Sequence, residues 1–159
     1  MTLTRVMIIT VFKCVVDTFI LQNYWNKYMK ESRKEELILV GEYNIELNDI
    51  LDINIEKMKI YRSKGLPTHM VKRKHYNCLK YIDYIPEIIK NPDYVGVNPN
   101  ESTISFELIK KYSDNIMIGI KIDTDGRYLY VSTMHDIQES KVKRRLFSGR
   151  LKQISVDKT

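Results

Sequence analysis

The chain has 159 residues, of which 43% are hydrophobic and 29% are charged, and its formal net charge is +6 at pH 7. Its length and composition fit a soluble globular protein with one principal domain. Its two cysteines, Cys14 and Cys78, exclude the disulfide framework of a small secreted protein and lack zinc-ligand spacing, so we expect free thiols, no metal and a cytoplasmic protein. The positive charge favours an acidic partner such as nucleic acid, with an ordinary basic surface as the alternative.

The N-terminal segment is largely apolar from Val6 to Leu21, but Lys13 and Asp17 interrupt it. The run is shorter than the ~20 residues of a membrane span, and no small-residue cleavage site follows it. We expect a helix that packs on the domain or on a partner, with a membrane anchor as the alternative. Residues 23–36 are polar and charged, so we divide the chain into an N-terminal helical extension, 1–36, and a domain, 37–159.

The domain begins with two short strands around one helical segment. Residues 37–40 form an apolar run that predicts a buried strand, and helical spacing follows over residues 45–51. Residues 59–62 predict a second short strand, which Ser63-Lys64-Gly65 ends with a turn.

Two prolines then predict the first turns of two helices, because the missing N–H of proline costs nothing there. Pro67 opens a helix that runs to His75, which places His69 near its N-terminus. Pro86 lies in the first turn of a helix over residues 84–90, which Asn91-Pro92 ends.

Period-two patterns follow, and they predict an antiparallel sheet. Residues 94–97 and the alternating segment around Ile104, Phe106 and Leu108 are strand-like. The Asp125-Gly126 pair predicts a two-residue type I′ turn between two hairpin strands. Counting outward pairs Ile122 with Leu129, Ile120 with Val131 and Ile118 with Thr133 on the core face. On the polar face it pairs Lys121 with Tyr130 and Gly119 with Ser132. A final helix over residues 139–147 completes an α+β arrangement in which helices mostly precede the sheet.

Metal-free cleavage of RNA needs a base for the 2′-hydroxyl proton, an acid for the leaving oxygen and cations for the charged phosphorane. His69 and Arg73 are four residues apart, so they share one helix face, which Lys72 borders. Glu107 projects opposite its apolar strand neighbours. We therefore interpret His69 as the general acid, or as the base in a different pose, and Glu107 as the candidate base.

The hairpin and the last helix supply the remaining candidates. Arg73 and Lys121 would clamp the phosphate, and Ser132 or Tyr130 would donate a hydrogen bond. Tyr130 could also stack on a base, and Thr133 is a secondary candidate. Lys141, Arg144 and Arg145 would contact phosphate non-specifically.

Each candidate also has a purely structural interpretation. His69 could cap its helix, and the Lys72-Arg73-Lys74 run could be a solvated face. Glu107 and Lys121 could form a surface ion pair worth ~1 kcal/mol or less. His75 and His135 are weaker candidates. No phosphate-binding loop, dinucleotide fingerprint, H-E-x-x-H helix or serine elbow occurs, so no cofactor is expected.

Several segments together resemble the phage-encoded nuclease domains of the barnase–EndoU–colicin–RelE superfamily over about residues 40–152. The segments are Val40-Gly41, the His69-x-x-Lys72-Arg73-x-His75 helix, the Tyr84 to Pro99 block with Pro92-Asp93-Tyr94-Val95-Gly96, Leu129 to Thr133, and Ser148 to Lys152. The resemblance implies a compact barnase/RelE-like fold of helices and a twisted antiparallel sheet. It also implies metal-independent RNA cleavage, and by position it supports His69, Arg73, Ser132 and Thr133.

We therefore predict a metal-independent endoribonuclease of phage or toxin type. It would act on RNA such as tRNA or mRNA in the cytoplasm of a bacterial host, with a cognate inhibitor protein as a further partner and no membrane association. The alternative is a non-catalytic phage factor that binds RNA or a host protein through the same basic face. A third interpretation tethers the domain to a membrane through residues 6–21.

Overall fold

The computed structural model describes residues 37–154, and the predicted N-terminal helical extension lies outside them. The helical elements are α2 (Leu47–Leu51), α3 (Leu66–Lys72), the 3₁₀ helix η1 (Tyr76–Tyr84), α4 (Ile85–Lys90) and α5 (Glu139–Phe147). The strands are β1 (Leu37–Glu42), β2 (Lys59–Ser63), β3 (Tyr94–Val97), β4 (Ser105–Lys111), β5 (Asn115–Ile122), β6 (Leu129–Ile137) and β7 (Leu151–Gln153). None of the helices in this part of the chain has the length and apolar character that spanning a bilayer requires.

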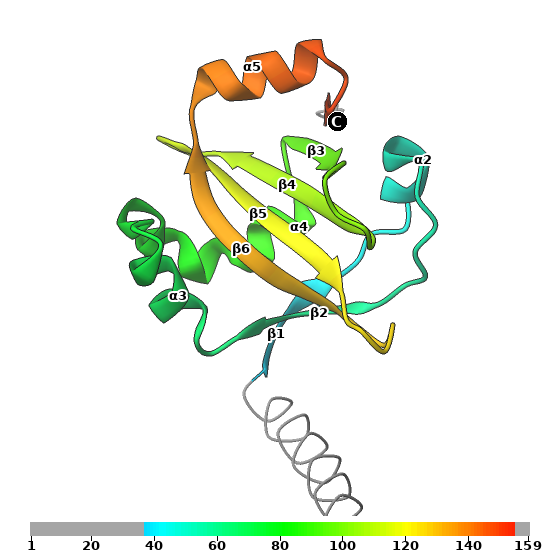
Figure 1. The fold of residues 1–159 in the computed structure, drawn as a ribbon, viewed down its shortest axis with the longest axis horizontal. Helices are drawn as coiled ribbons and strands as arrows, with labels where there is room; N and C mark the ends of the chain where they lie inside the picture. Colours follow the sequence, from blue (N-terminus) through cyan, green and yellow to red (C-terminus); the bar gives the residue numbers. More distant parts are fainter. Residues whose placement is uncertain (1–36, 155–159) are drawn as a thin grey trace, which may run out of the picture. The chain divides into compact units, whose positions relative to one another are not determined.

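The described strands form one seven-stranded sheet in the order β1-β2-β6-β5-β4-β3-β7. The α+β class is confirmed, but the prediction of a purely antiparallel sheet is wrong. β2 runs parallel to β6, with Ile60 opposite Leu129 and Tyr61 opposite Tyr130. β1 and β2 precede α3, η1 and α4 in the chain, as the strand-like segments at residues 37–40 and 59–62 predicted (Figure 1). Periodicity along β2 shows which side chains are buried but not the direction of the partner strand. The parallel pairing of β2 with β6 was therefore not predictable from the local pattern.

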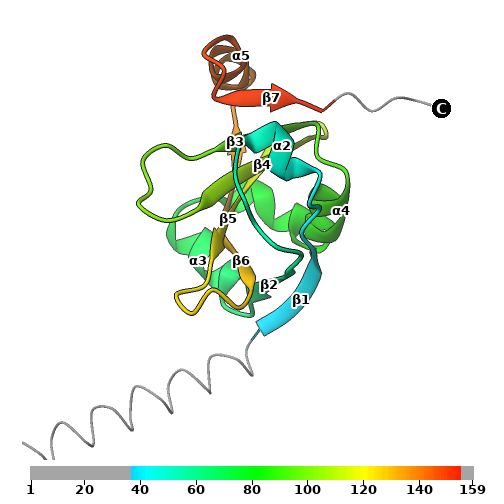
Figure 2. The same ribbon diagram turned by 90° about the vertical axis from the view of Figure 1, so that its right-hand side faces the viewer.

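The two faces of the sheet pack against different helices. Even-numbered residues of β4 and β5, such as Phe106 and Ile118, are buried in the main core with residues of α3, η1 and α4. Odd-numbered residues Ile109 and Met117 form a second cluster with Val142 of α5. Figure 2 shows α5 and β7 toward one end of the sheet and β1 and β2 toward the other. Because strand side chains alternate between faces, the odd-numbered positions beyond α5 are left to line a pocket.

The β5–β6 hairpin departs from the prediction in its loop, while the register next to the loop is as predicted. Its loop is not a two-residue type I′ turn, because Gly126 has a φ of 67° while Asp125 is not among the residues with positive φ. The Gly126 N–H instead donates to the Asp123 carbonyl at 2.8 Å and the Asp123 N–H donates to the Tyr128 carbonyl at 2.9 Å, which is a longer loop. The predicted pairs Ile122–Leu129, Lys121–Tyr130 and Ile120–Val131 are nevertheless confirmed.

Candidate active site

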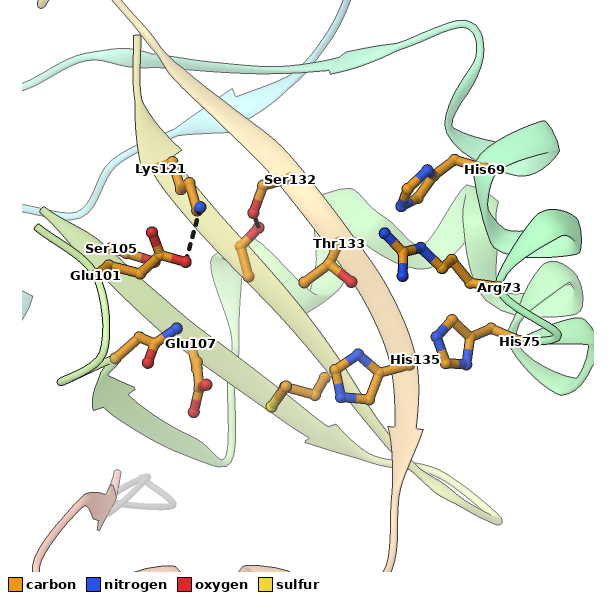
Figure 3. A pocket seen from close by; sticks show the side chains of 13 residues that line it. His69, Arg73, His75, Glu101, Ser105, Glu107, Lys121, Ser132, Thr133 and His135 are labelled. Carbon is orange, nitrogen blue, oxygen red and sulfur yellow. Dashed lines mark hydrogen bonds and ion pairs between the residues drawn. The ribbon is translucent and has the colours of Figure 1, made fainter. Parts of the chain in front are cut away.

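A pocket of about 370 Å³ opens on the α5 side of the sheet, beyond the end that the helix covers. Its walls come from α3, the β3–β4 loop and strands β4, β5 and β6 (Figure 3). The volume lies in the range of ligand pockets, which is roughly 300–1,000 Å³. The lining residues are His69, Arg73, His75, Asn98, Glu101, Ser105, Glu107, Met117, Gly119, Lys121, Ser132, Thr133 and His135. All six residues that the sequence suggested as catalytic are in this set.

A β-bulge at Ser132 forms the floor of the pocket. Gly119 pairs with Thr133 and Ile120 pairs with Val131, so Ser132 has no direct partner on β5. The predicted pairs Ile118–Thr133 and Gly119–Ser132 are therefore wrong, because the extra residue shifts the register by one beyond this point. The shift turns Thr133 to the pocket, so two consecutive hydroxyl side chains line it. Ser132 Oγ donates to the Gly119 carbonyl at 3.0 Å.

Gly119 is required for this close packing. A Cβ at position 119 would lie 2.8 Å from Thr133 Cγ2 and 3.4 Å from Ser132 Oγ. The approach to Thr133 is too close for a Cβ, so a side chain here would displace Thr133, whereas the distance to Ser132 is an ordinary contact.

The end of α3 brings two histidines and an arginine to the opposite wall. The His75 N–H donates to the Met70 carbonyl at 2.9 Å, and the Lys74 N–H donates to the Val71 carbonyl at 3.0 Å. This pattern is a Schellman motif, and its left-handed position, which usually holds glycine, holds Lys74 with a φ of 62°. The motif turns the chain so that His75 joins His69 and Arg73 in lining the pocket (Figure 3). Within residues 37–154, no acidic side chain forms an ion pair with Arg73.

Glu107 is held by two arginines that come from the C-terminal part of the domain. Its side chain is only 6% exposed, and its two carboxylate oxygens accept separate hydrogen bonds. Arg145 Nη1 donates to Oε2 at 2.9 Å, and Arg150 Nη2 donates to Oε1 at 2.8 Å. Both oxygens are thus engaged, which makes Glu107 an anchor for α5 and the following turn. The arrangement supports a structural role for Glu107 more than the predicted role of general base.

Lys121 pairs with a residue of the β3–β4 loop and not with Glu107. Its Nζ lies 2.8 Å from Oε1 of Glu101, and both side chains are partly exposed. A phosphate entering the pocket would therefore compete with the Glu101 carboxylate for this ammonium group. The surface pair that the sequence suggested between Glu107 and Lys121 does not form.

His135 and His75 stack against each other, with ring centroids 5.3 Å apart and planes inclined by 30°. Burial, followed by the nearby His75 and Arg145, lowers the pKa of His135 below its usual value of 6.5. A neutral imidazole at neutral pH is a competent proton acceptor. The sequence predicted His75 and His135 only as weaker candidates for the site. The bulge at Ser132 explains why for His135: in the predicted register Thr133 and His135 share the core face, and the shift by one residue turns both to the pocket.

The other residues predicted to bind RNA lie outside the pocket lining. Lys72, Lys141 and Arg144 are exposed at the surface, and Tyr130 lies beside Lys121 on the same face of the sheet. Arg145 is engaged with Glu107 and with the Met117 sulfur, at 3.3 Å from Nη1 to Sδ. Within the described residues, no group of three or more histidine, cysteine, aspartate or glutamate side chains is placed to hold a metal ion.

A comparison with protein families identifies the class of this domain as a nuclease. The family model described as phage-Barnase-EndoU-ColicinE5/D-RelE like nuclease3 matches residues 38–144, so the chain belongs to this family. The match includes every residue that lines the pocket and ends before Arg145 and Arg150. Comparison with curated proteins and with solved structures gives no match.

Proposed function

We propose that the domain is a metal-independent endoribonuclease that cleaves RNA by attack of a ribose 2′-hydroxyl on the adjacent phosphorus. The observation that carries this proposal is the composition of one pocket. Arg73 and Lys121 reach it from opposite walls, the histidines supply proton-transfer groups, and Ser132 and Thr133 supply hydroxyl donors. Acid–base groups combined with fixed cations are what this transesterification requires.

The proposed base is His135, in place of Glu107. Burial and the neighbouring His75 and Arg145 lower the pKa of His135, so its imidazole is neutral and able to accept the 2′-hydroxyl proton. His75 stacks on His135 and orients its ring. Glu107 keeps both oxygens bonded to arginines and contributes by fixing the wall of the pocket.

The proposed acid is His69, which reaches the pocket from α3 beside Arg73 (Figure 3). The bond between the 2′-oxygen and phosphorus forms as the bond between phosphorus and the 5′-oxygen breaks. His69 gives its proton to the departing 5′-oxygen, and His135 takes the proton of the 2′-hydroxyl. Arg73 and Lys121 balance the negative charge of the phosphorane, which is where preorganised charge stabilises the transition state most.

The substrate we propose is RNA of a bacterial host, such as tRNA or mRNA, because the family is phage-encoded and the chain has a net charge of +6. A nuclease of this kind would need a cognate inhibitor in any cell that makes it.

The direct test uses purified protein, total bacterial RNA and tRNA in the presence of EDTA. We expect cleavage by the wild-type chain and at least a hundredfold loss in His69→Ala and His135→Asn, since acid–base groups contribute about 10²–10⁴-fold. Arg73→Met should lose activity as well. Lys90→Met is the matched control, because it removes a positive charge from an exposed position at the end of α4. RNA binding without cleavage, retained in the histidine variants, would refute the proposal and support the non-catalytic binder.

A further inference from the structure

A row of side chains crosses the sheet from the edge of the pocket toward β2. Lys121 on β5 is paired directly with Tyr130 on β6, and Tyr130 is paired directly with Tyr61 on β2. Directly paired residues project to the same face of a sheet. Tyr61 and Tyr130 therefore continue the face on which Lys121 lines the pocket.

A third tyrosine strengthens this surface. Tyr128 lies two residues before Tyr130, and its ring contacts that of Tyr61 edge to face, with centroids 5.5 Å apart and planes inclined by 82°. All three side chains are partly buried, so each ring is supported while part of it faces solvent. We call Tyr61, Tyr128 and Tyr130 the tyrosine row. Fixed aromatic rings of this kind lose little conformational entropy when a ligand binds.

The spacing of the strands relates the tyrosine row to the proposed phosphate site. The backbones of neighbouring strands lie about 4.8 Å apart. The backbone of Tyr130 is therefore about 5 Å from that of Lys121, and the backbone of Tyr61 is about 10 Å from it. A phosphate held between Lys121 and Arg73 would bring the base of the adjoining nucleotide over Tyr130. The next nucleotide on that side would reach Tyr61 and Tyr128.

We infer that the tyrosine row is a stacking subsite for the unpaired bases of single-stranded RNA, next to the phosphate that the pocket holds. The inference rests on the proposed function for the identity of the ligand. Duplex RNA does not fit this subsite, because its bases are already stacked and their faces are covered by their neighbours. Stacking on an aromatic ring is tolerant of sequence, since every base has a π-face.

The test measures binding with a short, fully 2′-O-methylated RNA, which cannot be cleaved because its 2′-oxygens are blocked. Replacing one stacking aromatic residue costs about 1–3 kcal/mol, so Tyr130→Leu should weaken binding about 5- to 150-fold. Tyr130→Phe should bind like the wild type, because it keeps the ring. Tyr84→Leu is the matched control: this tyrosine is 48% exposed and contacts Tyr81 and Tyr112. A duplex of the same sequence should bind more weakly, and equally to all variants.

Equal binding of the single strand by the wild type, Tyr130→Leu and Tyr84→Leu would overturn the inference. A second measurement on the wild-type chain covers the case in which Tyr130→Leu does not fold. Photo-crosslinking to the same RNA carrying 5-iodouridine should label Tyr61, Tyr128 or Tyr130, and labelling only elsewhere would also overturn it. Neither readout depends on cleavage. If the wild-type chain does not cleave RNA but binds the single strand in a way that depends on the Tyr130 ring, the proposed function is refuted and the stacking subsite is not.

Discussion

The role of Glu107 can be decided by removing its charge. Glu107→Gln keeps the shape of the side chain but takes the anionic partner away from Arg145 and Arg150, whose side chains are only 20% and 26% exposed. Breaking a buried ion pair costs about 3–5 kcal/mol. The partial exposure of the two arginines lets water compensate in part, so we expect a loss near the lower limit, about 3 kcal/mol.

The assay is thermal unfolding followed by circular dichroism. For a domain of this size, each kcal/mol lowers the Tm by roughly 2–4 °C, so Glu107→Gln should lower it on the order of 10 °C. Glu101→Gln is the control, because it removes a carboxylate from the more exposed pair with Lys121 and should cost ~1 kcal/mol or less. A double-mutant cycle with Arg150→Met should show that the two losses are not additive.

The rate of RNA cleavage separates the two roles of Glu107 as well. If Glu107 is an anchor, Glu107→Gln should retain cleavage within about tenfold at temperatures where it stays folded, well short of the 10²–10⁴-fold loss expected for a missing base. An unchanged Tm together with loss of cleavage would refute this reasoning and restore Glu107 as the general base.

Three further predictions follow from individual residues. Burial lowers the pKa of His135 from 6.5, so the acid limb of the cleavage profile should have its midpoint below pH 6.5. A midpoint above 6.5 would exclude His135 as the base. Gly119→Ala places a methyl group 2.8 Å from Thr133 Cγ2, so urea unfolding should show a loss of about 1–3 kcal/mol, and unchanged stability would contradict the close approach. Lys74→Gly relieves a φ of 62° and should raise the free energy of unfolding by about 1 kcal/mol; a decrease would mean that Lys74 makes a stabilising contact.

Short-range patterns were enough to place most of the predicted site. The helix-opening role of Pro67 is confirmed, and it sets the position of His69 and Arg73 on α3. The period-two alternation also put Glu107 and Lys121 on the correct face of the sheet, because side-chain direction along a strand depends only on parity. The six residues suggested as catalytic come from three strands and a helix, yet they line one pocket.

The features that were missed depend on contacts between distant segments. Arg145 and Arg150 are 38 and 43 residues from Glu107 in the sequence, so no local pattern reveals that they engage it. The bulge at Ser132 did leave a local sign, because Ser132 and Thr133 are consecutive polar residues between the apolar Val131 and Met134 and so interrupt the alternation. The pairing of Gly119 with Thr133 shows that Ser132 is the extra residue. The parallel pairing of β2 with β6 likewise depends on how the intervening helices cross the sheet.

In the proposed mechanism, the 2′-hydroxyl of RNA is the nucleophile in this pocket. The most direct measurement compares two oligonucleotides in EDTA: an all-RNA strand and the same strand with a single 2′-deoxy substitution at the cleaved nucleotide. We expect the first strand to be cut to a product ending in a 2′,3′-cyclic phosphate and the second to resist cleavage at that position. His135→Asn should cut the first strand at least a hundredfold more slowly and leave the second intact. Cleavage of the 2′-deoxy strand at the same position and rate would contradict this mechanism.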